Sequence, residues 1–410
     1  ESNAVVGKIF QPCTEEFKLT ASDATADDFF GQSVAISGDV AIVGDPYDDD
    51  AGVDSGSAYV YVRNGGRWEV QAKLTASDAA PDDWFGYSVA ISGDVAIVGA
   101  PNDEYDTGYN IGSAYIFLRN GNLWEEQAKL TTSDSPEEEV ENKFFGYAVA
   151  ISGDVVIVGA YSDTFGLGNG AGSAYIFVRN GDTWEEQAKL TASDAAARDF
   201  FGWSVAINGD IAIIGSPNNG NIHGSWPWSG AAYIFTRNGE QWEERAKLTA
   251  SDAAEYDRFG WSVAVSEDAA IVGTPWNKDD AGNVSGSAYV FVRNGDTWEE
   301  KQNLTASDAA ARDFFGWSVA VSGDVAIVGS LYGKNDAGYR SGSAYIFTRN
   351  GDVWDEKKEL TASDAGEYDG FGFSVAVSGD IAIIGAPPYN YDVGERSGSA
   401  YIKYYNGCSQ

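Results

Sequence analysis

The sequence predicts an all-β chain that folds as a single seven-bladed β-propeller with four antiparallel strands per blade. The dipeptide Phe-Gly recurs seven times, from Gly31 to Gly372, at intervals of 55 to 60 residues. Each interval contains four short segments rich in Val, Ile, Ala, Tyr and Phe, separated by turn residues, which is typical of β-strands. Units this small cannot bury their own faces, so seven of them favour a closed ring over an open solenoid, for which no capping repeat is evident.

The strands of each repeat follow in a fixed order. A first strand ends in a Ser-Gly-Asp turn, as at 37–39 and 92–94, which leaves room only for a hairpin. An apolar second strand, a variable loop and a third strand of the type Gly-Ser-Ala-Tyr-Ile-Phe come next. Asn-Gly, at 64–65 and at the matching place in the other repeats, is the preferred dipeptide of a type I′ hairpin. This turn leads into a fourth strand that begins near a Trp.

The two ends of the chain are expected to share the last blade. The seventh repeat stops at residues 406–408, before its fourth strand, whereas residues 16–20 match the fourth strand of the first repeat at 71–75. We therefore expect residues 14–20 to complete blade seven. Cys13 and Cys408 would then lie on the two limbs of one hairpin and form a disulfide. In this scheme the propeller spans residues 13–408, and residues 1–12 form an N-terminal extension that could be an intersubunit segment.

Composition limits the classes of function. The chain of 410 residues carries 62 Asp and Glu against 26 Lys and Arg, a net charge of −36, so binding to nucleic acid or to anionic lipid is not expected. No apolar run is long enough for a transmembrane helix, so no membrane insertion is expected. The chain has one His and begins at Glu1, as a secreted protein does after loss of its signal peptide. We expect an extracellular or cell-surface location.

The repeated motifs resemble a known family. Phe-Gly-x-Ser-Val-Ala followed by Gly-Ala-Pro, at 99–101 and 385–387, is similar to the FG-GAP repeat of integrin α-subunit propellers, over residues 15–405. The resemblance implies a seven-bladed propeller, an extracellular location and ligand contacts through loops on one face. It also implies Ca²⁺ in an Asp-rich loop between the first and second strands. That loop is only Ser-Gly-Asp or an equivalent here, too short for a calcium cage, so the ligands of the family do not carry over.

The two faces of the predicted ring differ. Turns between strands one and two and between strands three and four are short, whereas the loops between strands two and three and the blade connections are long and acidic. We expect functional contacts on the second face. Each connection carries a first acid, from Asp23 to Asp364, for which we favour a structural role. A second acid, from Asp28 to Asp369, is replaced by Lys143 in the third repeat.

Four groups of residues are candidate sites. The first loop has the densest carboxylate cluster and is the best Ca²⁺ candidate, with a solvated acidic loop as the alternative: Asp45, Asp48, Asp49 and Asp50. The fourth loop could stack on sugar rings, anchor a protein partner or pack over the neighbouring blade: Asn221, His223, Trp226 and Trp228. Asn283 and Asn303 begin glycosylation sequons. Trp203, Trp261 and Trp317 follow Phe-Gly and belong either to the core or to the mouth of a central pocket.

The sequence shows no catalytic constellation, because its carboxylates repeat with the blades instead of forming one pair in two environments. We therefore expect a non-enzymatic protein that requires no cofactor, with Ca²⁺ as an option. The first hypothesis is an extracellular structural or adhesive propeller, which could be a subunit of a cell-surface or fibrous assembly. It would bind protein partners through its long acidic loops or assemble through residues 1–12. The alternative is a lectin that binds glycans with Trp and Asp loops.

Overall fold

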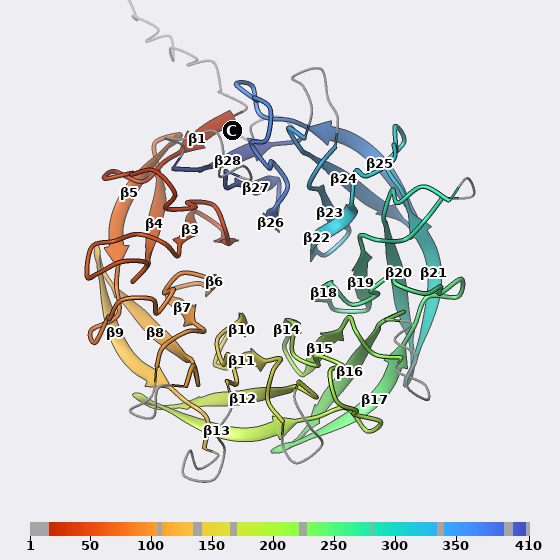
Figure 1. Ribbon diagram of the computed structural model, residues 1–410, viewed down its shortest axis with the longest axis horizontal. Coiled ribbons are helices and arrows are strands. Elements are labelled where there is room, and N and C mark those ends of the chain that lie inside the picture. Colours follow the sequence, from red (N-terminus) through yellow and green to blue (C-terminus); the bar gives the residue numbers. More distant parts are fainter. Residues whose placement is uncertain are drawn as a thin grey trace, which may run out of the picture.

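The computed structural model has the predicted all-β architecture, with seven four-stranded antiparallel sheets arranged around a central axis (Figure 1). It describes residues 16–104, 109–133, 142–164, 170–220, 228–279, 282–333, 340–388 and 397–406. All regular elements in these ranges are strands. No helix of the described residues is long and apolar enough to cross a membrane.

Each sheet is one blade, and its strands run from the central axis to the rim in chain order, except in blade seven. The innermost strands are β2 (Val34–Ser37), β6 (Ser88–Ser92), β10 (Ala148–Ser152), β14 (Ser204–Asn208), β18 (Ser262–Ser266), β22 (Phe315–Ser322) and β26 (Ser374–Ser378). The second strands are β3 (Val40–Asp45), β7 (Val95–Ala100), β11 (Val155–Ala160), β15 (Ile211–Ser216), β19 (Ala269–Thr274), β23 (Val325–Ser330) and β27 (Ile381–Ala386).

The third strands are β4 (Ser57–Asn64), β8 (Ser113–Asn120), β12 (Ser173–Asn180), β16 (Ala231–Asn238), β20 (Ser287–Asn294), β24 (Ser343–Asn350) and β28 (Ser399–Tyr404). The outer strands are β5 (Arg67–Leu74), β9 (Leu123–Leu130), β13 (Thr183–Leu190), β17 (Gln241–Leu248), β21 (Thr297–Leu304), β25 (Val353–Leu360) and β1 (Glu16–Leu19). Blades one to six are β2–β5, β6–β9, β10–β13, β14–β17, β18–β21 and β22–β25.

Blade seven contains strands from both ends of the described chain. Its sheet order is β26-β27-β28-β1, and β1 pairs antiparallel with β28 from Glu16 opposite Lys403 to Leu19 opposite Ala400. Phe17 of β1 also packs edge to face on Tyr404 of β28, with ring centroids 6.3 Å apart. Cys13, Cys408 and residues 1–12 lie outside the described residues, so the disulfide and the extension stay predictions.

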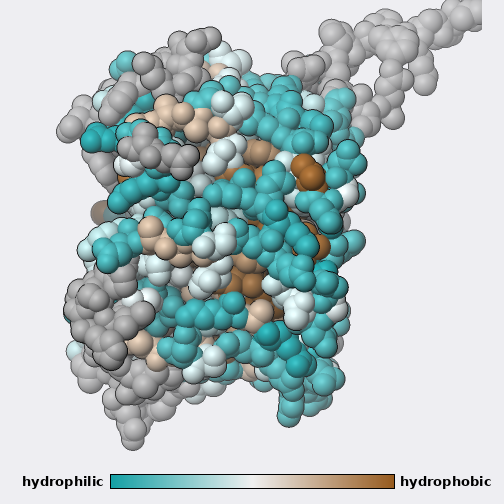
Figure 2. All heavy atoms as spheres, turned by 90° about the vertical axis from the view of Figure 1, so that its right-hand side faces the viewer, coloured by the Kyte–Doolittle hydropathy of each residue, from teal (hydrophilic) through white to brown (hydrophobic). Residues whose placement is uncertain are grey.

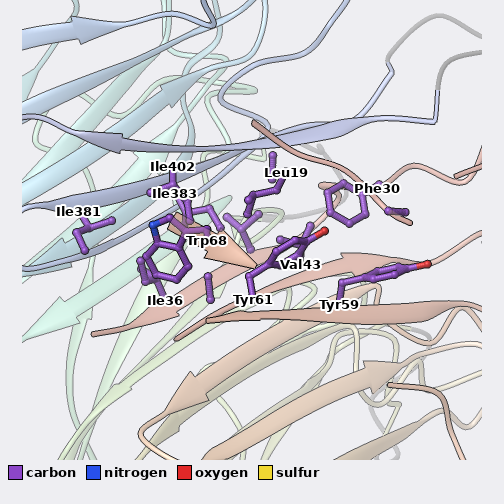
Figure 3. Packing of buried hydrophobic residues seen from close by; sticks show 14 of the residues in the cluster. Leu19, Phe30, Ile36, Val43, Tyr59, Tyr61, Trp68, Ile381, Ile383 and Ile402 are labelled. Atoms are coloured by element: carbon purple, nitrogen blue, oxygen red, sulfur yellow. The ribbon is translucent and has the colours of Figure 1, made fainter. Parts of the chain in front are cut away.

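The core lies between neighbouring blades. Second strands such as β3 and β7 are buried along their whole length, because each is covered by a blade on either side. This position explains why they are continuous runs of Val, Ala and Ile. Figure 3 shows the interface of blades one and seven, where Tyr61 and Trp68 pack with Ile383. The outer rim of the ring, seen in Figure 2, is mostly hydrophilic with small hydrophobic patches.

The glycine of Phe-Gly allows neighbouring blades to approach closely. Gly86 has a φ of +95°, and a Cβ atom there would lie 2.1 Å from the main-chain oxygen of Ser57 in blade one. Gly93, in the turn between β6 and β7, also has a positive φ of +59° but has nothing within 4 Å of that point. The first glycine is therefore required by the contact between blades, and the second only by the turn.

Candidate functional site

The strand directions place two kinds of connection on opposite faces. We call the face that carries the blade connections and the loops between second and third strands the long-loop face. The hairpin turns lie on the other face. The candidate sites described below are on the long-loop face.

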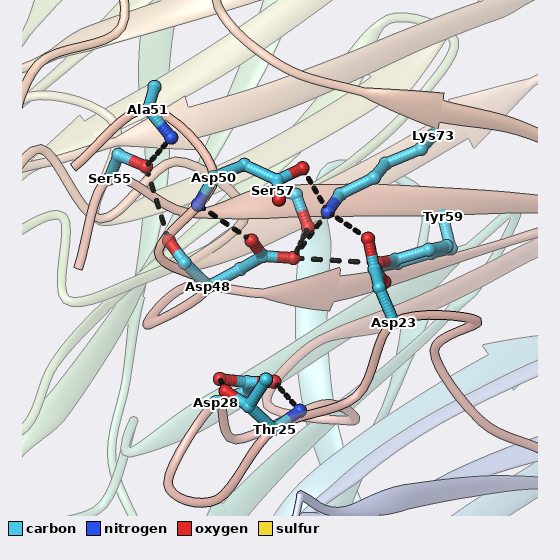
Figure 4. Close-up of polar contacts among 10 residues, drawn as sticks. All are labelled: Asp23, Thr25, Asp28, Asp48, Asp50, Ala51, Ser55, Ser57, Tyr59 and Lys73. Carbon is cyan, nitrogen blue, oxygen red and sulfur yellow. Dashed lines mark hydrogen bonds and ion pairs between the residues drawn. The ribbon is translucent and has the colours of Figure 1, made fainter. Parts of the chain in front are cut away.

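A lysine of the outer strand holds the acidic cluster of blade one together (Figure 4). The ammonium of Lys73 lies 2.7 Å from Asp23 and 2.7 Å from Asp48, and it also pairs with Asp50. The hydroxyl of Tyr59 donates to Asp23. Lys73 lies over the ring of Tyr59, 5.3 Å from its centroid. The first acid of the blade connection is thus bound by two side chains of the blade that it leads into.

The same unit of acid, tyrosine and lysine recurs around the ring. In blade two, Lys129 lies 2.7 Å from Asp78, and the hydroxyl of Tyr115 donates to Asp78 over 2.9 Å. Equivalent pairs of a first acid with a tyrosine are Asp194 with Tyr233, Asp252 with Tyr289, Asp308 with Tyr345 and Asp364 with Tyr401. Asn303 and Glu359 replace the lysine in blades five and six. Asp134, the first acid of blade three, is outside the described residues.

These contacts change the pKa of the first acids. Burial opposes ionisation of Asp23, but the hydrogen bonds from Lys73 and Tyr59 outweigh burial and lower its pKa. The pKa of Asp78 is lowered by the same balance, with Lys129 and Tyr115 as the donors. Asp23 and Asp78 are therefore ionised counter-ions of Lys73 and Lys129.

The predicted Ca²⁺ ligands belong to different surroundings. Asp48 and Asp50, with Asp23, bring carboxylate oxygens within 4.8 Å of one another. The ammonium of Lys73 lies at ion-pair distance from all three, so a Ca²⁺ ion at this point would have to displace it. Asp49 is exposed and accepts a hydrogen bond from the main-chain N–H of Asp54, 2.9 Å away. The three carboxylates therefore already have a positive partner, the ammonium of Lys73, at the point where a metal ion would bind.

Asp45 is completely buried, with 0% of its surface exposed. Neither of its carboxylate oxygens has a hydrogen-bond partner among the described residues. Burial, with the nearby charges of Asp28 and Asp48, raises its pKa well above the usual value. At the equivalent position in blade four, Ser216 donates to the main-chain oxygen of Asp199 over 2.8 Å.

The second acid closes a local turn in the connections that carry one. Asp83 accepts from the main-chain N–H of Ala80 over 2.7 Å, and Asp199 accepts from that of Ala196 over 2.9 Å. Both carboxylates are buried, and burial raises the pKa of each to about 6 despite these hydrogen bonds. Each of these acids stabilises the connection by a side-chain hydrogen bond to the main chain three residues earlier.

Six aromatic side chains surround the central axis on the long-loop face. Each follows Phe-Gly at the start of an innermost strand, with Trp317 inside β22 and the others directly before their strands. Each blade but the first therefore contributes one: Tyr87, Tyr147, Trp203, Trp261, Trp317 and Phe373. We call this set the aromatic collar. Successive ring centroids are 5.0, 4.8, 4.7, 5.1 and 5.8 Å apart. Gln32 of blade one takes the seventh position.

The aromatic collar lines a cavity of about 580 Å³. The cavity is also lined by Gln32, by the serines that follow the collar positions and by valines of the innermost strands. No charged residue lines it among the residues that the structure describes. A second layer of aromatic residues supports the collar; Phe200 stacks on Trp203 at 6.1 Å, and Trp276 meets Trp261 edge to face at 4.5 Å.

One arginine stands beside this aromatic layer. The guanidinium of Arg258 lies 4.9 Å from the ring centroid of Trp276, 5.9 Å from that of Trp261 and 5.3 Å from that of Trp228. Burial lowers the pKa of Arg258, which nevertheless stays far above neutrality for a guanidinium. Its positive charge therefore lies against the tryptophan side of the site.

The structure describes only part of the other predicted sites. Asn221, His223 and Trp226 are outside the described residues, whereas Trp228 packs edge to face on Tyr256 at 5.6 Å and beneath Arg258. These contacts fit the packing alternative for Trp228. Asn283 and Asn303 are both exposed, as a glycosylation acceptor must be. The amide of Asn283 donates to Asp279 over 3.1 Å.

The aromatic collar could have been found from the sequence only in part. The sequence places Trp203, Trp261 and Trp317 either in the core or at the mouth of a pocket, and in the structure they line the cavity. Tyr87, Tyr147 and Phe373 occupy the same place in their repeats, so aligning the repeats on Phe-Gly was the available signal.

Fold and site together define a β-propeller with an aromatic-lined cavity at the centre of one face. Comparison with protein-family models matches the FG-GAP repeat seven times, at residues 13–61, 68–117, 124–177, 184–235, 242–291, 298–347 and 354–403. The chain therefore belongs to the FG-GAP repeat family. No curated protein matches it. FG-GAP propellers are typical of protein-binding and adhesion domains and of extracellular or cell-surface proteins.

Proposed function

We propose that this chain is a non-enzymatic adhesive propeller of the cell exterior, which holds its ligand at the centre of the long-loop face. One observation carries the proposal: six blades each direct an aromatic side chain to one uncharged cavity in a chain of net charge −36. Aromatic residues gathered in a concave site are typical binding anchors. Each of them lies at the start of an innermost strand, so the ring holds the set in place.

The acidic residues have a different part in this function. The first acids are bound by tyrosine and lysine in similar ways in several blades, and the second acids close turns. Acid–base catalysis instead requires two carboxyl groups with different surroundings at one place. We assign these acids to the scaffold, and the exposed acids of the loops to the exclusion of anionic partners.

Adhesion assays with collar variants test the proposal. The purified protein would be immobilised and probed with cells and with extracellular-matrix extracts. Trp203→Ala and Trp317→Ala should each lower retention strongly, because each removes a central aromatic contact. Leu123→Ala is the matched control, since Leu123 is 64% exposed on the outer strand β9. Equal retention by the wild type and both collar variants, with unchanged melting temperatures, would refute a ligand at the collar.

Self-assembly is a second candidate. Each sheet ends in an outer strand, such as β5 or β9, whose far edge is unpaired within the described residues. Residues 1–12 include an apolar stretch that could add to such an edge on another copy of the chain. Deletion of residues 1–12 should then yield folded monomers in light scattering and electron microscopy, and persistence of assemblies would exclude this route.

A further inference from the structure

The cavity inside the aromatic collar offers two kinds of surface on opposite sides. Blades four to six supply the indole rings of Trp203, Trp261 and Trp317. Blades one to three supply side chains that carry polar groups, Gln32, Tyr87 and Tyr147, and the two tyrosine hydroxyls are hydrogen-bonded to each other. The ring of seven blades places the first set across the axis from the second. A ligand that fits must therefore present an apolar side and a hydrogen-bonding side.

The serines below the aromatic collar add acceptors. Ser88 donates its hydroxyl proton to the main-chain oxygen of Gly146 in the next blade over 2.7 Å, and Ser204 does the same to Gly260 over 3.0 Å. The same bond recurs from Ser33, Ser262, Ser318 and Ser374. Because each hydroxyl proton is already engaged, a serine oxygen that meets a ligand can only accept a hydrogen bond, for example from a hydroxyl group.

Charged ligands do not fit this cavity. An ion that enters it leaves water and meets no opposite charge among the described lining residues, which costs free energy. A cation meets a further obstacle, since Arg258 already lies 5.9 Å from the ring centroid of Trp261. The electron-rich face of that indole is thus partly used by a charge of the protein itself.

From these observations we propose that the aromatic collar binds a neutral pyranose, such as the terminal sugar of a glycan; this rests on the proposed function and names its ligand class. The C–H face of the sugar lies on the indoles of Trp203, Trp261 and Trp317. Its hydroxyl groups meet Gln32, the tyrosine hydroxyls and the serine oxygens. A cavity of about 580 Å³ has the size of a small-molecule site and not that of a protein interface.

Titration with defined sugars tests the proposal. The probes are the methyl pyranosides of glucose, galactose, mannose, fucose and N-acetylglucosamine, measured by calorimetry on the full chain. Glucuronic acid, glucosamine, N-acetylarginine amide and N-acetylleucine amide serve as anionic, cationic and apolar comparators. We expect saturable binding of at least one neutral pyranoside and none of the comparators.

Variants locate the bound sugar. Trp261→Ala should weaken binding by about tenfold or more, the size of effect typical of a central aromatic anchor. Gln32→Leu removes the polar side while leaving the aromatic collar in place, and it should also weaken binding. Tyr256→Ala is the control, because Tyr256 is 50% exposed and does not line the cavity. Melting temperatures verify that each variant is folded.

The outcomes separate the two proposals. If no neutral pyranoside binds, or if a comparator binds better, the ligand class is wrong; the adhesive function still stands if the Trp203 and Trp317 variants lose retention. If a sugar binds equally well to Trp261→Ala, Gln32→Leu and the wild type, the sugar site is elsewhere and the inference fails. If the collar variants lose sugar binding but are still retained in the adhesion assay, only the proposed adhesive function is contradicted.

Discussion

Asp45 occupies a position that the other blades fill with Ala, Ser or Thr. Those residues are uncharged, and the position is buried in every blade. In blades four and six, Ser216 and Ser330 donate to the main-chain oxygen of the second acid, over 2.8 and 2.9 Å. A protonated Asp45 could make the same bond to Asp28, whereas an ionised Asp45 has no donor there. The raised pKa of Asp45 is therefore the response of a carboxyl group placed in a serine's position.

We expect Asp45→Ser to stabilise the protein, by about 1–3 kcal/mol near pH 8, because it removes a buried acid without a partner. The pKa of Asp45 is raised on folding, so the wild type loses stability as the pH rises above the unfolded value of 3.8. The gain in the free energy of unfolding of Asp45→Ser should therefore become smaller as the pH is lowered. Urea denaturation at two pH values would measure it, with the exposed Asp49→Ser as control. An equal gain at both would contradict the raised pKa.

The glycines of Phe-Gly lead to a second prediction. We expect Gly86→Ala to lower the free energy of unfolding by about 3 kcal/mol or more, because its Cβ would collide with the main chain of blade one. Gly93→Ala, at a positive φ without a neighbour, should cost only about 1 kcal/mol. Denaturant titration of both variants compares them. Similar losses would show that backbone strain, and not the contact between blades, decides the cost.

At the scale of the element, the blade connection is fixed to its surroundings through three polar positions. Its serine bonds to a glutamate on the next outer strand; Ser77 donates through its N–H and hydroxyl to Glu126 over 2.9 and 2.8 Å. The first acid binds tyrosine and lysine, and the second acid closes the turn. The near-identical sequence of these connections therefore follows from the attachment of each blade to the one before it.

The lysine of blade one is expected to act as a built-in counter-ion. Lys73→Ala should lower stability by about 1–2 kcal/mol, mainly through Asp48, because Asp23 and Asp50 are half exposed and screened by solvent. The three carboxylates would then offer a site to Ca²⁺. Thermal melts with Ca²⁺ and with a chelator should differ for this variant and agree for the wild type. If the melting temperature of Lys73→Ala does not depend on Ca²⁺, the three carboxylates do not bind the metal after the lysine is removed. Lys357→Ala, on an exposed lysine, is the control.

At the scale of the whole molecule, buried and paired acids set the dependence of stability on pH. The pKa values of Asp83, Asp199 and Asp313 are raised by burial to about 6. The folded state binds these protons more tightly than the unfolded chain, so lowering the pH through 6 favours folding. The lowered pKa values of Asp23, Asp78 and Asp194 act in the opposite direction, and only below the unfolded value of 3.8.

The melting temperature should therefore rise from about pH 8 to about pH 5 and fall again in stronger acid. High salt during the scan screens the general repulsion that a net charge of −36 produces. The pH dependence of the melting temperature that remains is then due to the buried acids. Asp83→Asn, which keeps the shape and removes the titration, should flatten the rise. A flat profile for the wild type in high salt would contradict the raised pKa values.

Much of the fold could be predicted from the sequence because its determinants are local and repeated. Asn-Gly and Ser-Gly-Asp specify hairpins, and an apolar run such as residues 40–43 specifies a strand that is buried on both sides. The structural role favoured for the first acid also agrees with the contacts of Asp23 and Asp78. The role of Lys73 was not foreseen, because Asp50 and Asp23, its partners, are 23 and 50 residues away in the chain.

By itself the sequence determined the number of blades, the order of their strands and the face that carries the long loops, since seven copies of one pattern repeat each local signal. Only the tertiary structure decided that Tyr87, Trp203 and Phe373 line one cavity, that Lys73 lies among three carboxylates and that Asp45 is sealed from water. The reason is distance along the chain. These residues belong to different strands, loops or blades, and they meet only where the folded ring brings those elements together.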